Sequence, residues 1–284
     1  MLAPEPLRLA TWHAGEGDHV RITSLYRSPV VSLGTFWCPP DDVRWEQENY
    51  VGDVAHIAFP ASPVWISGHG EELALAGPNH AMFFNAGDWF RRRRFNGNGD
   101  RNLFMVVGED TMAEWLADAR FPGHVAKLLP RPYMTVRALA RAIADDIDAL
   151  AVEERLLALG HATVTGAFGR GEYRIRRRTP AVVEEAKALL TARYNERLTL
   201  DELGRAVNVS PFHLARSFRR HTGYTLHEYR TQLRLRAALD RLAQGDEDLV
   251  HIARAVGYSS HSHLTASFRR VFGVPPSRVR RRLT

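Results

Sequence analysis

The sequence contains two closely similar stretches, SPFHLARSFRRHTG at residues 210–223 and SHSHLTASFRRVFG at residues 260–273. At an offset of 50 residues, eight of the fourteen pairs of positions are identical. Upstream, the match continues at an offset of 49, where Arg205-Ala206-Val207 is repeated as Arg254-Ala255-Val256. The slip of one residue falls between two segments of helical pattern, and a turn is where an extra residue costs least. The repeat indicates that a unit of two helices and a turn has been duplicated.

Each copy carries the signals of a helix-turn-helix. In the first copy, the pattern predicts a short helix at Leu200–Val207 and a second helix at Pro211–His221. Ser210 is a favourable N-cap residue, and Pro211 is a favourable first residue of a helix. Gly223 is suited to end that helix. The second copy repeats these signals, so we expect two similar units.

A continuous helix is predicted between the two units, at Leu226–Gln244. A helix of this length extends for about 28 Å, at about 1.5 Å per residue. Successive major-groove openings on one face of DNA lie about 34 Å apart. The connecting helix therefore has the right order of length to place two recognition helices in adjacent major grooves.

The charge of the chain is concentrated at its C-terminal end. The whole chain has a net charge of +6, but residues 180–284 carry +8 and residues 1–179 carry −2. A basic excess confined to one domain is expected where that domain binds phosphates. The alternative is a helical repeat that makes protein contacts, in which the arginines lie on solvated faces.

The first ~108 residues have the pattern of a β domain. Short runs rich in β-branched and aromatic residues are separated by Gly, Pro, Asn and Asp, which is typical of closely spaced strands in a barrel or sandwich. Strands are predicted at Val20–Tyr26, Val30–Trp37, Val54–Phe59, His80–Asn85 and Leu103–Val107. Helices are predicted after them, at Thr111–Arg120, Gly123–Leu129 and Thr135–Leu150, continuing through Val152–Leu159.

These patterns predict an α+β protein of two domains. The N-terminal domain spans residues 1–165, with strands to about residue 108 and helices after them. Residues 166–179 contain three glycines and a basic run, and we interpret them as a linker. Residues 180–284 form an all-α domain with two helix-turn-helix units joined by the connecting helix.

The C-terminal domain resembles the DNA-binding domain of the AraC family of bacterial transcription regulators, from Leu198 to Arg280. The first unit carries the resemblance in Leu200-Asp201-Glu202-Leu203, Val209-Ser210, His213-Leu214 and Phe218-Arg219. The second unit carries it in Val256-Gly257-Tyr258-Ser259-Ser260, Leu264, Phe268-Arg269-Arg270, Phe272-Gly273 and Pro275-Pro276. The resemblance implies that one chain reads two adjacent major grooves.

The resemblance also implies positions for DNA contacts. Its base-reading positions fall on Phe212, Ala215, Arg216, His261, Ser262, Thr265 and Ala266. An arginine can contact a guanine edge with two hydrogen bonds, and an apolar side chain can contact a thymine methyl group. The arginines near the helix ends are expected to bind phosphates and so fix the register, namely Arg219, Arg220, Arg269 and Arg270. Ala266 is shorter than the polar residues common at that position, so we expect the first unit to carry more of the sequence specificity.

The N-terminal domain resembles the variable, cupin-like sensing domain of the same family. The resemblance rests on Ile57-Ala58-Phe59-Pro60 and on the stretch Gly77–Asp88. A candidate effector pocket is marked by four tryptophans of the β region: Trp37, Trp45, Trp65 and Trp89. The alternative is that these aromatic residues belong to the core. The run Arg91–Arg94 is a candidate for binding an anionic effector, or else a solvated strand edge or loop.

Other chemistry is weighed against this interpretation. A metal-binding cupin needs a His-x-His pair, and residues 1–170 contain none, so no metal site is predicted. The pair His261/His263 lies in the second helix-turn-helix, where His263 repeats His213. The single cysteine, Cys38, cannot form an internal disulfide. It could act as a redox sensor only if its thiol were acidic and exposed, and the alternative is a buried thiol.

The sequence has no apolar run of 18 residues, so no membrane span is predicted. The first residues, MLAPEP, lack the pattern of a secretion signal, and we expect a cytoplasmic protein.

We predict a sequence-specific DNA-binding transcription regulator and not an enzyme, with no cofactor and no catalytic residue. Activation is the commoner role that the resemblance implies. The predicted partners are double-stranded promoter DNA, RNA polymerase, a small-molecule effector and a second copy of the chain, joined through the N-terminal domain or its helices. The alternative hypothesis is a cupin-type small-molecule binder or metalloenzyme with an incidental basic tail.

Overall fold

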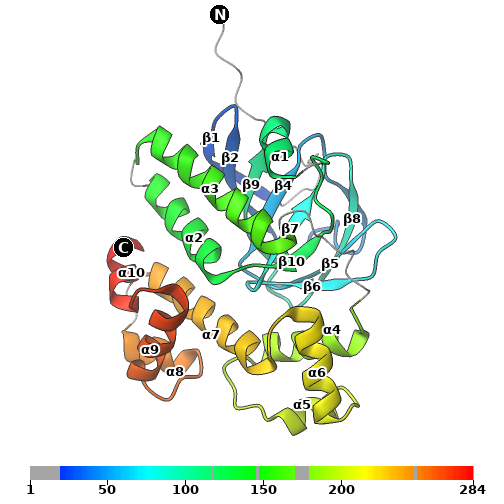
Figure 1. Ribbon diagram of the computed structural model, residues 1–284, viewed down its shortest axis with the longest axis vertical. Coiled ribbons are helices and arrows are strands. Elements are labelled where there is room, and N and C mark those ends of the chain that lie inside the picture. The colour runs from blue at the N-terminus through cyan, green and yellow to red at the C-terminus, as the bar shows by residue number, and fades with distance from the viewer. Residues whose placement is uncertain (1–19, 117, 145–146, 170–178, 246–247, 284) are drawn as a thin grey trace, which may run out of the picture. The chain divides into compact units, whose positions relative to one another are not determined.

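The computed structural model describes residues 20–283, apart from 117, 145–146, 170–178 and 246–247. Contacts between residues divide the chain into two compact units, 1–176 and 177–284. The predicted α+β class is confirmed, since the first unit is rich in strands and the second is helical (Figure 1). In the described part of the chain, no helix is both long and apolar enough to cross a membrane.

The first unit is built on two antiparallel sheets. The larger sheet has the order β1 (Arg21–Arg27), β2 (Val31–Cys38), β9 (Asp100–Val107), β4 (His56–Pro60), β7 (His80–Phe84) and β10 (Val125–Lys127). The smaller sheet has the order β3 (Glu48–Tyr50), β8 (Trp89–Arg94), β5 (Val64–Gly68) and β6 (Ala74–Ala76). Side chains of both sheets meet in one apolar cluster, so the core of this unit lies between the sheets.

Alternation along the strands decides which side chains enter this core. In β8, Phe90 and Arg92 are buried, whereas Trp89, Arg91 and Arg93 are exposed. Successive side chains of a strand point to opposite faces of its sheet, which explains the pattern. The inward face of β8 thus contributes one aromatic and one charged side chain to the interior.

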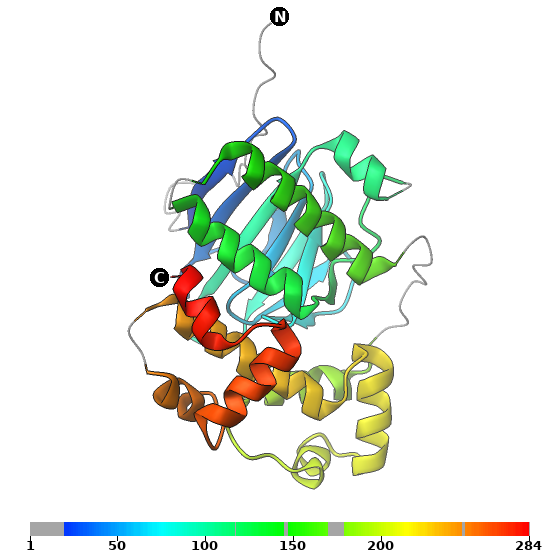
Figure 2. The same ribbon diagram turned by 60° about the vertical axis from the view of Figure 1, so that its left-hand side comes forward.

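Three helices follow the strands: α1 (Glu109–Trp115), α2 (Pro130–Ala144) and α3 (Ala149–Phe168). The antiparallel pair α2 and α3 covers the outer face of the larger sheet (Figure 2). Leu139 of α2 and Leu156 of α3 are buried in this layer. Phe168, in the last turn of α3, packs against Phe83 of β7 with ring centroids 4.7 Å apart.

The second unit consists of helices only. The first helix-turn-helix is α5 (Leu200–Ala206) and α6 (Pro211–Thr222), and it packs with α4 (Ala181–Ala192). The second is α8 (Leu249–Ala255) and α9 (His261–Phe272), followed by α10 (Pro276–Leu283). The connecting helix, α7 (Leu226–Ala243), contacts α4 and α6 of the first half and α8, α9 and α10 of the second.

The caps predicted for the recognition helices α6 and α9 are confirmed. Ser210 accepts a hydrogen bond from the backbone N–H of His213, and Ser260 accepts one from that of His263. Gly223 ends α6 in the left-handed region, with φ of 68°. The local sequence signals therefore fix both ends of the first recognition helix.

The two turns share one backbone feature. Asn208 in the first turn has φ of 55°, and Gly257 in the second has φ of 85°. These residues correspond to each other at the offset of 49. Left-handed backbone is easiest for glycine and is tolerated by asparagine, so both residue types suit this position.

Several predicted elements of the first unit are wrong. The helix expected at residues 123–129 is strand β10, which pairs with β7 because Val125–Lys127 complete the edge of the larger sheet. The helix expected at 111–120 ends at Trp115. The single helix expected at 135–150 is two helices, since Asp148 caps the start of α3 by accepting a hydrogen bond from the Ala151 N–H. Leu150 is exposed and does not continue the buried face of α2.

The predicted linker also begins too early. Residues 166–168 belong to α3, because the packing of Phe168 on Phe83 extends that helix by another turn. Residues 170–178 lie outside the described residues.

Two buried ionisable groups face the space between the sheets. Burial lowers the pKa of His56 to about 4, and its ring stacks on Phe84 at 4.6 Å. Burial raises the pKa of Asp100 to about 6, although the nearby Arg92 opposes this rise. The pKa values of the two groups shift in opposite directions, so the two groups change the stability of the fold in opposite directions as the pH rises.

We predict that Asp100→Asn changes the pH dependence of the stability of the first unit. Between pH 4 and 6 the unfolded chain releases the Asp100 proton while the folded chain retains it. The contribution of Asp100 therefore falls as the pH rises through this window, by up to ~3 kcal/mol. His56 acts in reverse, because its contribution is present above about pH 6.5 and is lost as the pH falls toward 4.

The measurement is urea unfolding followed by tryptophan fluorescence, since all six tryptophans precede residue 176. Relative to the unmodified protein, Asp100→Asn should gain stability from pH 4 to 6. Parallel stability curves for the two proteins would contradict the assignment of this titration to Asp100.

We also predict that Gly257→Ala destabilises the second unit. Alanine in the left-handed region costs ~1–2 kcal/mol, and its Cβ would also collide with the backbone of Asn195. Asn208→Gly is the matched control and should be tolerated. Thermal unfolding followed by helical circular dichroism tests this, with tryptophan fluorescence reporting an unchanged first unit. A variant as stable as the unmodified protein would show that the turn does not require glycine.

Candidate DNA interface and interior cavity

The first recognition helix, α6, has one buried face and one exposed face. Leu214 and Phe218 are fully buried and join the cluster that contains Leu203 and Val207. Residues three and four apart lie on the same face of a helix. The opposite face therefore carries the predicted contact residues Phe212, Arg216, Arg219 and Arg220, which are exposed, and Ala215, which is half-buried.

The second recognition helix, α9, repeats this arrangement. Leu264 and Phe268 are fully buried, as are Ile252 and Val256 of α8. The predicted contact residues that are exposed are His261, Ser262, Ala266, Arg269 and Arg270, and Thr265 is half-buried. The structure thus brings each predicted set together on the open face of its own helix.

Phe212 is unusual among the exposed side chains. It is 76% exposed, on the first turn of α6. The N-terminal residues of a recognition helix are those that contact base edges, and an aromatic side chain there can contact a thymine methyl group. The exposure of Phe212 is explained if DNA covers it.

The exposed arginines of α6 and α9 are not paired with carboxylates among the described residues. By contrast, Arg205 of α5 binds Asp201, and Arg193 binds Glu196. The acidic Glu202 and Glu228 cap the starts of α5 and α7 instead. The guanidinium groups of the recognition helices are therefore available to phosphates.

The recognition helix α9 presents fewer long side chains at the base-reading positions than α6 does. At the positions of Phe212 and Arg216 in α6, α9 has Ser262 and Ala266. The ring of His263 packs edge-on against the ring of Tyr258, with centroids 5.1 Å apart, so this histidine contributes to packing within the domain.

The four tryptophans predicted for an effector pocket are not brought together. Trp37 and Trp65 lie under the guanidinium groups of Arg21 and Arg93, at 5.3 and 5.6 Å. Trp89 is 46% exposed and packs on Tyr50. Trp45 is buried, and its indole N–H donates to the Pro39 carbonyl. Three of them lie in strands whose inward neighbours, not they, face the interior.

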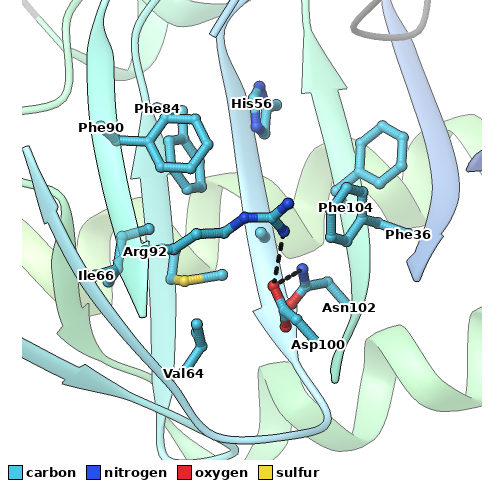
Figure 3. Close-up of a pocket in the computed structure, with 12 residues that line it drawn as sticks. Phe36, His56, Val64, Ile66, Phe84, Phe90, Arg92, Asp100, Asn102 and Phe104 are labelled. Carbon is cyan, nitrogen blue, oxygen red and sulfur yellow. Dashed lines mark hydrogen bonds and ion pairs between the residues drawn. The ribbon is translucent and has the colours of Figure 1, made fainter. Parts of the chain in front are cut away.

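A cavity does lie between the two sheets (Figure 3). Four phenylalanines line it, namely Phe36, Phe84, Phe90 and Phe104, together with smaller apolar side chains. Four polar side chains also line it: His56, Arg92, Asp100 and Asn102. The space open to the centre of a water molecule is about 20 Å³, so the cavity is small.

Of these four polar residues, sequence reasoning named only Arg92, as part of the run Arg91–Arg94. Nothing in the run itself separates the one inward arginine from its neighbours. Strand periodicity sets Phe90 and Arg92 on one face and Trp89 and Arg91 on the other, but with an aromatic residue on each face the sequence does not show which face is buried.

Cys38 lies beside this cavity and is fully buried. Its Sγ accepts a hydrogen bond from an Arg92 Nη at 3.1 Å. Burial nevertheless raises the pKa of the thiol to about 12. The thiol is neither acidic nor exposed, so the condition set for a redox sensor is not met.

The described residues contain no group of three or more His, Cys, Asp or Glu side chains that could hold a metal ion. The ring of His56 is instead stacked on Phe84, inside the sandwich.

Comparison with known proteins identifies the helical unit. Residues 203–282 match a family model described as a helix-turn-helix domain. The HTH-type transcriptional regulator ArgR of Pseudomonas aeruginosa is 34% identical over 92 residues, which cover 32% of this chain and 28% of that protein. The HTH-type transcriptional regulator GlxA of Rhizobium meliloti is 39% identical over 80 residues, 28% of this chain and 25% of that protein. The similarity thus spans less than a third of the length of either regulator.

A solved structure is similar over a comparable share of this chain. It is a transcriptional regulator of Chromobacterium violaceum, described by its AraC-type DNA-binding domain, with 31% identity over 36% of this chain and 92% of that one, and a TM-score of 0.35. The match over residues 203–282 confirms the resemblance seen in the sequence, and the C-terminal unit of this chain contains an AraC-type helix-turn-helix domain.

Proposed function

We propose that this protein is a sequence-specific DNA-binding regulator of transcription. The observation that carries this proposal is the duplicated recognition helix. Each of α6 and α9 buries an apolar face and presents an open face with arginines that no described carboxylate neutralises. The connecting helix α7 has 18 residues, or about 27 Å, which suits two grooves about 34 Å apart.

The contacts divide into two kinds. Arg219, Arg220, Arg269 and Arg270 lie in the last two turns of their helices, where phosphate contacts would position the domain without reading sequence. Phe212 and Arg216 lie nearer the start of α6, where they would contact a thymine methyl and a guanine edge. His261, Ser262, Thr265 and Ala266 take the corresponding places in α9.

The first unit would modulate this activity. A ligand that binds one conformation better than another shifts the balance between them by its differential affinity. Helices α2 and α3 are the surface we propose for a homodimer contact, and RNA polymerase is the partner we propose for activation. The named relatives are transcriptional regulators, and no described residue cluster favours a metalloenzyme.

We predict different effects for two arginines of the same helix. A preferred site is first selected from random duplex DNA, and binding is then followed by fluorescence anisotropy over a range of salt concentrations. Arg216→Ala should weaken binding to the preferred site by ~1–3 kcal/mol and relax the preference at one base pair. Arg219→Ala should weaken preferred and unrelated sequences alike and reduce the slope of log K against log salt by about 1.

The matched control is Arg101→Ala, which removes an exposed arginine from β9 in the other unit and should change neither quantity. If Arg216→Ala weakened all sequences equally, or Arg219→Ala left the salt slope unchanged, the assigned roles would be wrong.

We predict that the two halves of the site differ in how strictly they are read. Arg216→Ala identifies the half that contacts α6, because it relaxes a preference there. Each base-pair substitution in that half should weaken the binding free energy by ~1–3 kcal/mol. A substitution in the half that contacts α9 should weaken it by less than ~1 kcal/mol. Equal costs in the two halves, or the reverse order, would show that the side chains of α9 read bases as fully as those of α6.

A further inference from the structure

Arg92 is a charged side chain enclosed in a largely apolar interior. It is 2% exposed and extends from β8 into the space between the sheets (Figure 3). Its guanidinium lies over the rings of Trp45 and Phe36, at 4.8 and 5.3 Å. Removing a charge from water is costly unless it gains strong partners, so the partners of Arg92 decide what this cavity can do.

The partners that the protein supplies are weak. One Nη donates to the Cys38 thiol, a poor acceptor. Another Nη lies 3.7 Å from Asp100, which is an ion pair but longer than a hydrogen bond. The Nε–H of Arg92 has no hydrogen-bond partner among the described residues. A guanidinium has five N–H donors, so several of them stay available to an acceptor in the cavity.

The opposite wall is also incompletely satisfied. The Asn102 amide donates to Asp100 at 3.4 Å. One oxygen of Asp100 and the Asn102 carbonyl oxygen have no partner in the described part of the chain, although both side chains are at least nine-tenths buried. Buried polar atoms without partners are rare, and each one calls for a water, an ion or a ligand.

The lining favours an anion that carries a single charge. Arg92 is the one permanent cation among the described lining residues, and burial keeps His56 neutral at neutral pH by lowering its pKa to about 4. Asp100 has a pKa raised to about 6, so it can take up a proton and donate an O–H to an incoming anion. A dianion such as phosphate would need a second cation that this lining lacks.

We propose that the cavity between the two sheets binds a short-chain monocarboxylate, with its carboxylate on Arg92 and its apolar end against Phe84, Phe90 and Phe104. Guanidinium and carboxylate form two parallel hydrogen bonds, which would use the donors that Cys38 and Asp100 leave free. The rings of Phe84 and Phe90 pack on each other with centroids 5.0 Å apart, so they form a continuous aromatic wall. The space now open to water is about that of one water molecule, so binding requires the lining side chains to move apart and limits the ligand to a short chain.

Binding of the carboxylate does not depend on the proposed function, whereas its role as an effector does. The strands that hold Arg92 and Asp100 belong to the first unit, and the recognition helices belong to the second. A failure of carboxylate binding would therefore leave DNA binding untouched, and a failure of DNA binding would leave the cavity assignment untouched.

The test is titration calorimetry on the full chain in a carboxylate-free buffer. The probes are acetate and propionate, and the controls are acetamide and propionamide, which have nearly the same shape without the charge. We expect the carboxylates to bind with dissociation constants of roughly 0.1–1 mM and the amides at least tenfold more weakly. Equal binding of acids and amides, or no binding of the acids, would overturn the proposal.

Three variants connect the binding to Arg92. Arg92→Met should abolish carboxylate binding, whereas Arg91→Met, which removes the exposed arginine next to it, should leave binding unchanged. Because Arg92→Met could unfold the unit, Asp100→Asn provides a second readout that keeps Arg92 in place. The Asn side chain of this variant carries no negative charge that would compete with acetate for Arg92, and its N–H can donate to acetate. Acetate should therefore bind Asp100→Asn at least about threefold more tightly than it binds the unmodified protein. Weaker or unchanged binding of acetate to Asp100→Asn would contradict the proposal.

Discussion

The helical unit depends on one constraint: helices α5 and α8, of seven residues each, cannot be stable alone. Each forms because it shares a small apolar core with the helix that follows it. In the first half, Leu203 and Val207 meet Leu214 and Phe218. This packing fixes which face of the recognition helix is buried, and the open face follows by geometry. The exposure of Phe212 and Arg216 is thus a consequence of the burial of Leu214 and Phe218, which lie on the other side of the same helix.

The duplication explains why the second unit could be predicted so fully from sequence. Caps, turns and apolar positions repeat at a fixed offset, so each copy supports the interpretation of the other. The first unit offered no such check. Its short strands β3 and β6 have three residues each and carry no clear period. Strand β10 has the length of a single helical turn, and only its pairing with β7 makes it a strand. Local pattern cannot show such pairing, because the partner lies some forty residues away.

The candidate effector site also could not be predicted from local sequence pattern. The four tryptophans of the β region suggested a pocket, but three of the four lie at outward-facing positions of their strands. The side chains that face the interior are their neighbours, including Arg92 beside the run of exposed arginines. Arg92 and Asp100 lie on different sheets, so only the packing of the two sheets brings them within 3.7 Å. Burying this charge costs stability, and the proposed carboxylate would offset part of that cost.

The central claim is that one chain reads two successive major grooves through a connecting helix of fixed length. The most direct measurement is the affinity of the full chain for a selected DNA site into which about five base pairs, half a helical turn, have been inserted between the two contacted segments. Affinity is expected to fall to that of a site with only the α6 half intact, because α7 cannot stretch and the two grooves now face opposite sides. Unchanged affinity for the lengthened site would contradict the claim, since the two recognition helices would then not be reading the site together.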